Sequence, residues 1–127
     1  MSEDLAANYA RAYGGKVGFG ARPALILIDF CHGYFDEGCD LFAGVEDALA
    51  SALRVREAAH AAGVPVVLTN VVYHPSGVDG GRFYEKALPL RYFQRGNPMG
   101  AFASGLTPRD DEIIVSKQYP SAFFGTS

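Results

Sequence analysis

The sequence has 127 residues and a mass of 13.6 kDa, which is among the commonest sizes for a single domain. Apolar residues make up 49% of it and charged residues 20%, a balance that supplies a hydrophobic core and excludes a disordered or collagen-like chain. The formal net charge is −3 with no basic block, which disfavours nucleic-acid binding and a polybasic membrane surface.

The first half of the sequence predicts a helix, a strand, a second helix and a second strand. Apolar residues at helical spacing predict a short amphipathic helix over 5–13. The unbroken apolar run over 24–28, which Asp29 closes, is typical of a parallel strand that is covered on both faces. Residues 45–62 repeat apolar side chains every three or four positions and predict a helix, and residues 65–72 predict the second strand. This succession predicts a βαβ unit.

The second half is less regular. Residues 73–109 form a long excursion rich in Gly, Pro and aromatic residues, with at most a short helix near 83–88. Long excursions in compact domains are usually functional. Residues 112–116 predict a third strand, and residues 118–127 read as a loop that enters a helix.

The cysteine count and the N-terminus indicate a cytoplasmic protein. Two cysteines cannot build a disulfide framework, so a reducing compartment is expected. The acidic, polar first residues show no secretory signal. The longest continuous apolar run, residues 24–28, is too short to cross a bilayer.

Two charged residues lie at the C-terminal ends of predicted strands. In open α/β sheets, reactive groups gather at these ends. Asp29 closes the first strand and Lys117 lies at the end of the third. Because the preceding strand residues are apolar, both side chains should be partly desolvated and attract each other. We therefore expect an Asp–Lys pair that is a candidate functional site; a purely structural ion pair is the alternative.

The cysteines and histidines give weaker signals. Cys39 lies among acidic residues, which disfavours a thiolate, and we interpret both Cys31 and Cys39 as buried small hydrophobes. His60 falls on the predicted second helix and is expected to face solvent. The histidines at positions 32, 60 and 74 show no metal-ligand spacing, so no metal site is predicted.

Three stretches carry a family resemblance. They are GFGARPALILIDF over 18–30, VPVVLT over 64–69 and SKQYPSAFFGT over 116–126. Together they resemble the isochorismatase-like cysteine hydrolases, most closely the branch of N-carbamoylsarcosine amidohydrolase and maleamate amidohydrolase. The resemblance extends from about residue 13 to the end, and the Lys-x-Tyr-x-Ser-Ala-Phe-Phe-Gly-Thr pattern is its most specific part.

The resemblance implies a three-layer α/β/α fold with a parallel sheet. Residues 1–127 would form the N-terminal part of a single domain of this kind. It also implies a triad in which Asp29 and Lys117 match the aspartate and the lysine. The family's cysteine follows a further strand, and neither Cys31 nor Cys39 matches its position. We therefore expect the nucleophile-bearing C-terminal part to be absent, as in a fragment; the alternative is a short protein whose free sheet edge a partner chain covers.

The implied activity is an amidohydrolase acting on a linear amide or ureido C–N bond. A cysteine thioester would form and ammonia would leave, without a metal or another cofactor. The implied substrate is a small amide that carries a carboxylate, resembling N-carbamoylsarcosine or maleamate. Residues 72–75 lack the Asp-x-His pattern of nicotinamidases, which argues against that activity. The resemblance also implies a homo-oligomer.

Candidate substrate-binding residues are drawn from the long loop and from the residues after each strand. The guanidinium of Arg82 could pair with a substrate carboxylate, or it could be a solvated loop residue. Aromatic candidates could wall the pocket or fill the core. The full set is Arg82, Phe30, Phe35, Tyr119 and Ser121. Two rival functions stay open: a catalytically incomplete binding module of the same fold, and a hydrolase that uses Cys31 as its nucleophile.

Overall fold

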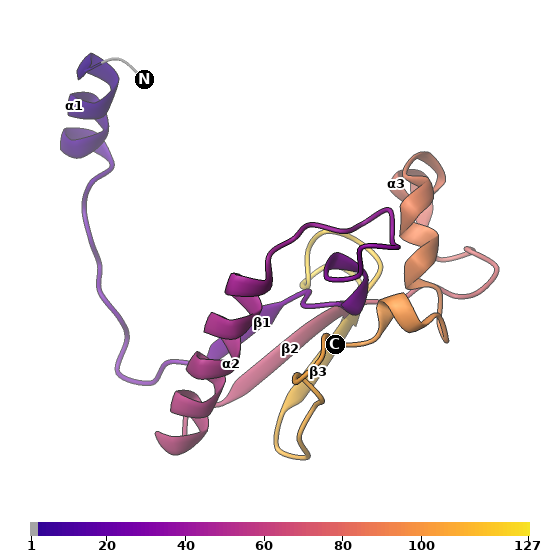
Figure 1. Ribbon diagram of the computed structural model, residues 1–127. Coiled ribbons are helices and arrows are strands. Elements are labelled where there is room, and N and C mark those ends of the chain that lie inside the picture. The colour runs from indigo at the N-terminus through magenta and orange to yellow at the C-terminus, as the bar shows by residue number, and fades with distance from the viewer. Residues whose placement is uncertain (1–2) are drawn as a thin grey trace.

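Three parallel strands form the centre of the computed structural model, which describes residues 3–127 (Figure 1). They are β1 (Leu25–Ile28), β2 (Val66–Val71) and β3 (Ile113–Lys117), in the order β1-β2-β3. Leu25 is in register with Val66, and Val71 with Lys117. Because the strands are parallel, their carboxyl ends meet at one edge of the sheet. The predicted α/β class with a parallel sheet is confirmed.

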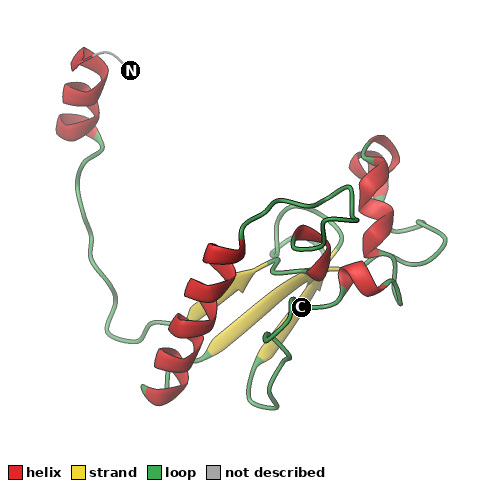
Figure 2. Cartoon of the chain, viewed as in Figure 1, coloured by secondary structure: helices red, strands yellow, loops and turns green. Residues whose placement is uncertain are grey.

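One face of this sheet is covered by helix α2 (Glu46–Ala61), which connects β1 to β2 (Figure 2). The main core lies between them: Leu27 and Leu68 are at most 6% exposed and pack with Ala52 and Ala59 of the helix. Helix α1 (Glu3–Ala12) lies apart from the sheet, at the far end of an extended segment (Figure 1). Among residues 3–127, no helix has the length and apolar character needed to cross a membrane.

The long excursion after β2 folds into short helices near the carboxyl ends of the strands. They are α3 (Gly81–Lys86) and the 3-10 turns η2 (Leu88–Phe93) and η3 (Pro98–Gly100); a further turn, η1 (His32–Tyr34), follows β1. A second core cluster forms here from buried side chains: Cys31, Val71, Tyr73, Tyr84 and Phe93. This cluster gives the excursion a fixed position beside the strand ends.

The other face of the sheet is uncovered, so the prediction that both faces are buried is wrong for the described residues. Ile26 and Ile28 of β1 are 50% and 63% exposed, and Ile113 of β3 is 57% exposed. Successive side chains of a strand point to opposite faces. Helix α2 therefore covers Leu27 and leaves its two isoleucine neighbours on a face where no helix of residues 3–127 packs.

The helix expected within residues 118–127 is also absent, and turns take its place. The hydroxyl of Ser121 accepts a hydrogen bond from the backbone N–H of Phe123 at 3.1 Å, which favours a local turn over a helix. Phe123 is 93% exposed.

A buried ion pair ties helix α2 to the start of β3. The Arg56 guanidinium donates to both carboxylate oxygens of Glu112, at 2.8 and 2.5 Å, and to the backbone carbonyl of Thr107. His60, expected to face solvent, instead lies 2.9 Å from a Glu112 oxygen. Hydrogen bonds from Arg56, and then from His60 and a backbone N–H, lower the pKa of Glu112 to about 2.

We expect the substitution Glu112→Gln to destabilise the fold, because it leaves the buried Arg56 guanidinium without its counter-ion. The free energy of unfolding at pH 7 should fall by about 3 kcal/mol, as is typical when one partner of a buried pair is removed. Urea denaturation followed by circular dichroism measures the change. Glu85→Gln is the control, because the Arg82–Glu85 pair is exposed and contributes little.

The same pair has a defined pH dependence. The pKa of Glu112 is lowered from 4.5 to about 2 in the folded state, so its contribution is complete above pH 4.5 and is lost as the pH falls toward 2. The stability difference between wild type and Glu112→Gln should therefore shrink across that interval. A difference that stays constant down to pH 2 would contradict this assignment.

Candidate functional site

The Asp29 and Lys117 side chains meet at the carboxyl ends of β1 and β3. Lys117 Nζ lies 2.9 Å from Asp29 Oδ2, and the side chains are 5% and 22% exposed. Lys117 also donates to the backbone carbonyl of Pro120 at 2.7 Å. The strand register brings this about, because β3 ends at Lys117 beside β2, and β1 ends one residue before Asp29. The structure thus forms the pair, whereas the catalytic role of each residue stays a prediction.

Asp29 has an unusual backbone conformation. Its φ angle is +58°, and no other non-glycine residue among those described has a positive φ. Asp tolerates this left-handed region better than most residues. Its backbone N–H donates to the carbonyl oxygen of Thr69 at 3.2 Å and to Thr69 Oγ1 at 3.1 Å. The Thr69 hydroxyl in turn donates to Asp29 Oδ1 at 2.7 Å.

A cavity of about 150 Å³ opens beside the pair, lined by Asp29, Lys117 and several aromatic side chains. Tyr34, Tyr73 and Phe83 are among its walls. Burial, with smaller contributions from Cys31 and Asp29, raises the pKa of Tyr34 to about 12. Tyr34 therefore keeps its proton at neutral pH, and its hydroxyl can donate a hydrogen bond.

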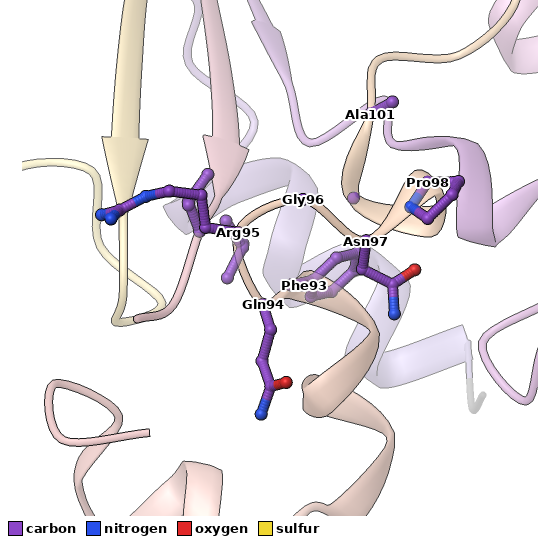
Figure 3. Close-up of a pocket in the computed structure, with 10 residues that line it drawn as sticks. Phe93, Gln94, Arg95, Gly96, Asn97, Pro98 and Ala101 are labelled. Carbon is purple, nitrogen blue, oxygen red and sulfur yellow. The ribbon is translucent and has the colours of Figure 1, made fainter. Parts of the chain in front are cut away.

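Two larger hollows adjoin this region but differ in chemistry. One, of about 320 Å³, is lined mainly by residues 93–101, where the Gln94 and Arg95 side chains point away from each other (Figure 3). It contains no carboxylate or cysteine that could act as a base or nucleophile. The other, of about 420 Å³, lies over the uncovered sheet face and includes Ile26, Ile28, Thr69 and Lys117. Lys117 therefore lines both the aromatic cavity and the apolar hollow, and Asp29 lines the aromatic cavity.

The predicted substrate-binding residues are dispersed. Tyr119 lines the aromatic cavity and Ser121 lines the apolar hollow. Arg82 lies on α3 with its side chain 97% exposed, paired with Glu85. Phe30 and Phe35 stack on each other with ring centroids 6.5 Å apart, and Phe30 packs against the main core. Of these residues, only Tyr119 and Ser121 line a space that Lys117 also lines.

Cys31 and Cys39 are both free and buried. Cys31 is fully inaccessible, and burial raises the pKa of its thiol to about 11. Cys39 is 5% exposed, with its sulfur close to Gly33. No group of three or more His, Cys, Asp or Glu residues within 3–127 is arranged to hold a metal ion.

Three contributors to the site were not found from the sequence. Thr69 follows three apolar residues of β2 and precedes Asn70, and this change from apolar to polar within the strand was the available signal. The Pro120 carbonyl is a backbone group, which no residue pattern reveals. Tyr34 lies five residues after Asp29, and only the turn η1 directs it to the cavity.

Comparison with known proteins relates this chain to one family. Residues 23–127 match the Isochorismatase domain. The chain is 42% identical over 122 residues to a maleamate amidohydrolase from Pseudomonas putida, and 32% identical over 123 residues to an N-carbamoylsarcosine amidase from an Arthrobacter species. These matches cover 94% and 92% of this chain, but 57% and 46% of the relatives, so the chain spans about half the length of the curated relatives it matches.

A solved structure shows the same fold. The crystal structure of a cysteine hydrolase from Pseudomonas syringae superposes with a TM-score of 0.76 and 25% sequence identity. The match covers 83% of this chain and 50% of that one. With the domain match over residues 23–127, these similarities show that the chain belongs to the isochorismatase-like hydrolase family.

Proposed function

We propose that this chain contributes the general base and its lysine partner to a cysteine amidohydrolase. The reaction cleaves a linear amide or ureido C–N bond of a small substrate that carries a carboxylate, such as maleamate or N-carbamoylsarcosine. The observation that carries the proposal is the Lys117–Asp29 ion pair, which lies at the carboxyl edge of the sheet beside a small aromatic cavity. The names of the two curated relatives support the substrate class.

In the proposed reaction Asp29 accepts the proton of a cysteine thiol. The ammonium of Lys117 pairs with the Asp29 carboxylate beforehand and stabilises the thiolate that forms. The thiolate attacks the carbonyl carbon, and the C–N bond breaks as the protonated Asp29 returns its proton to the leaving nitrogen, which departs as ammonia. Water then hydrolyses the thioester, giving the acid and regenerating the thiol.

The nucleophile in this proposal is not Cys31 or Cys39. A reactive cysteine needs a lowered pKa and access to the substrate, whereas the pKa of Cys31 is raised to about 11 and its side chain is fully buried. We therefore assign the nucleophile to a polypeptide segment outside residues 1–127. Such a segment could reach Asp29 from the uncovered sheet face, where the hollow includes Thr69 and Lys117.

The substrate carboxylate needs a cation, and Arg82 remains our candidate. Its neighbour Phe83 lines the aromatic cavity. The present partner of Arg82 is Glu85, at 3.1 Å and largely exposed. An exposed ion pair of this kind contributes little free energy, so a substrate carboxylate could replace Glu85 at small cost.

The decisive assay measures ammonia release from maleamate, N-carbamoylsarcosine and nicotinamide. Two proteins are compared: the 127-residue chain, and a chimera in which it is followed by the unmatched remainder of the Pseudomonas putida maleamate amidohydrolase. We expect release only by the chimera, and only from the linear substrates. Asp29→Asn and Lys117→Ala should each lower kcat by about 10²- to 10⁴-fold, whereas Lys86→Ala, at an exposed lysine of α3, should not.

Other outcomes would contradict the proposal in distinct ways. Release by the chain alone that disappears in Cys31→Ser would assign the nucleophile to Cys31. A folded chimera that releases no ammonia from any of the three substrates would favour a catalytically incomplete binding module.

The state of Cys31 can be tested separately by alkylation. With a thiol pKa of about 11 and no exposed surface, Cys31 should react with iodoacetamide at pH 7.5 far more slowly in the native chain than in urea. Peptide mass spectrometry locates the modification. Rapid native labelling of Cys31 would show that the thiol is accessible and ionised, contrary to this expectation.

We also propose that another polypeptide covers the uncovered sheet face. Exposed apolar patches on sheets, and free strand edges, mark sites of association. The isolated chain should therefore self-associate in light-scattering measurements, and Ile26→Lys should shift it toward the monomer. Val55→Lys is a matched control, because Val55 is 49% exposed on helix α2 and Ile26 is 50% exposed on the sheet. A stable wild-type monomer would contradict this proposal.

A further inference from the structure

We propose that Thr69 is a positioning residue that fixes the carboxylate of Asp29 for proton transfer. This inference rests on the proposed function, in which Asp29 is the general base. Thr69 lies on the central strand β2, in register with Ile28, and is 2% exposed. It is a buried hydroxyl residue in the strand sequence VVLTNV at the middle of the sheet, so its polar group must be satisfied locally.

The Thr69 hydroxyl contacts Asp29 twice. Its Oγ1 accepts a hydrogen bond from the Asp29 backbone N–H at 3.1 Å and donates to Asp29 Oδ1 at 2.7 Å. The same N–H also lies 3.2 Å from the Thr69 carbonyl oxygen. One hydroxyl thus links the backbone of Asp29, held at a positive φ of 58°, to the orientation of its carboxylate.

Without this hydroxyl, Lys117 alone would orient the carboxylate. The terminal torsion of an aspartate is broad and roughly two-fold, so a single partner on Oδ2 leaves rotation of the group poorly defined. Asp29 is 22% exposed and lines the cavity, so water could otherwise compete for Oδ1. A second partner on Oδ1 fixes the plane of the carboxylate.

The two partners also determine where a proton can arrive. Lys117 can only donate to Oδ2, and the Thr69 hydroxyl donates to Oδ1 while it accepts from the Asp29 N–H. A carboxylate has about four lone-pair positions, so one on each oxygen remains available. A proton from an approaching thiol must bind at one of these two positions, whose direction Thr69 and Lys117 hold constant.

The sharpest test compares a variant that removes the Thr69 hydroxyl with a variant that keeps it. Thr69→Val keeps the shape of the side chain and the backbone hydrogen bond, whereas Thr69→Ser keeps the hydroxyl. Ser116→Ala is the matched control: its hydroxyl donates to Asn70 Oδ1 at 2.7 Å between β3 and β2, on the other side of the central strand, without contact to Asp29. All three variants are made in whichever of the two assayed proteins releases ammonia, the chimera or the 127-residue chain.

We expect Thr69→Val to lower kcat by about 10- to 100-fold, as for loss of a hydrogen bond to a charged group, and to leave KM within about twofold. Thr69→Ser and Ser116→Ala should stay within about threefold of wild type. Adding Thr69→Val to Asp29→Asn should cause no further loss, because the hydroxyl acts through Asp29. A wild-type kcat in Thr69→Val, or a further full loss in the double variant, would overturn the proposal.

A second readout needs no hydrolysis. In the isotopically labelled 127-residue chain, the backbone amide and side-chain ¹³Cγ signals of Asp29 should move in Thr69→Val, return toward wild type in Thr69→Ser, and stay in place in Ser116→Ala. If the Asp29 signals do not move in Thr69→Val, the Thr69 hydroxyl does not contact Asp29 and the proposal is wrong. If no protein form releases ammonia, the proposed function fails, while these spectra still decide whether Thr69 orients Asp29.

Discussion

The parallel register of the three strands is the constraint on which the site depends. Residues 29 and 117 are far apart in sequence, and they meet because β1 and β3 flank β2 and end at the same edge of the sheet. Taking two charges out of water is costly, and their attraction compensates only when the remaining donors and acceptors are also satisfied. The Thr69 hydroxyl and the Pro120 carbonyl supply that compensation for Asp29 and Lys117 respectively.

Strand β3 has an ion pair at each of its ends. At its start, Glu112 bonds to Arg56 of helix α2, and at its end Lys117 bonds to Asp29. Between these points its apolar side chains are poorly covered: Ile113 and Ile114 are 57% and 47% exposed. A strand with so little burial gains limited hydrophobic stabilisation. The ladder to β2 sets its register, and the two ion pairs anchor its ends where packing does not.

The sequence predicts part of the site where a charged residue lies at the end of a predicted strand. Asp29 and Lys117 could be predicted because parallel strands place such residues together. Thr69 could not, because its role depends on which neighbour its hydroxyl reaches across the sheet. The prediction that both faces of the sheet are covered was wrong because an apolar sequence shows only that a strand can be buried. It does not show which segment covers each face, and Ile26 is 50% exposed. His60 was placed in solvent because its partner, Glu112, is remote in sequence.

The surroundings of the ion pair favour different approaches for the two reactants. Aromatic side chains enclose the smaller cavity on one side, where the protonated Tyr34 can donate a hydrogen bond. Apolar side chains of β1, β2 and β3 line the larger hollow on the sheet face, which suits a packed polypeptide better than a polar substrate. Lys117 lines both spaces and can stabilise charge in either. In the proposed reaction, a thiol that enters from the sheet face would therefore meet the substrate at the lysine, while Cys31 stays buried in the core with its thiol protonated.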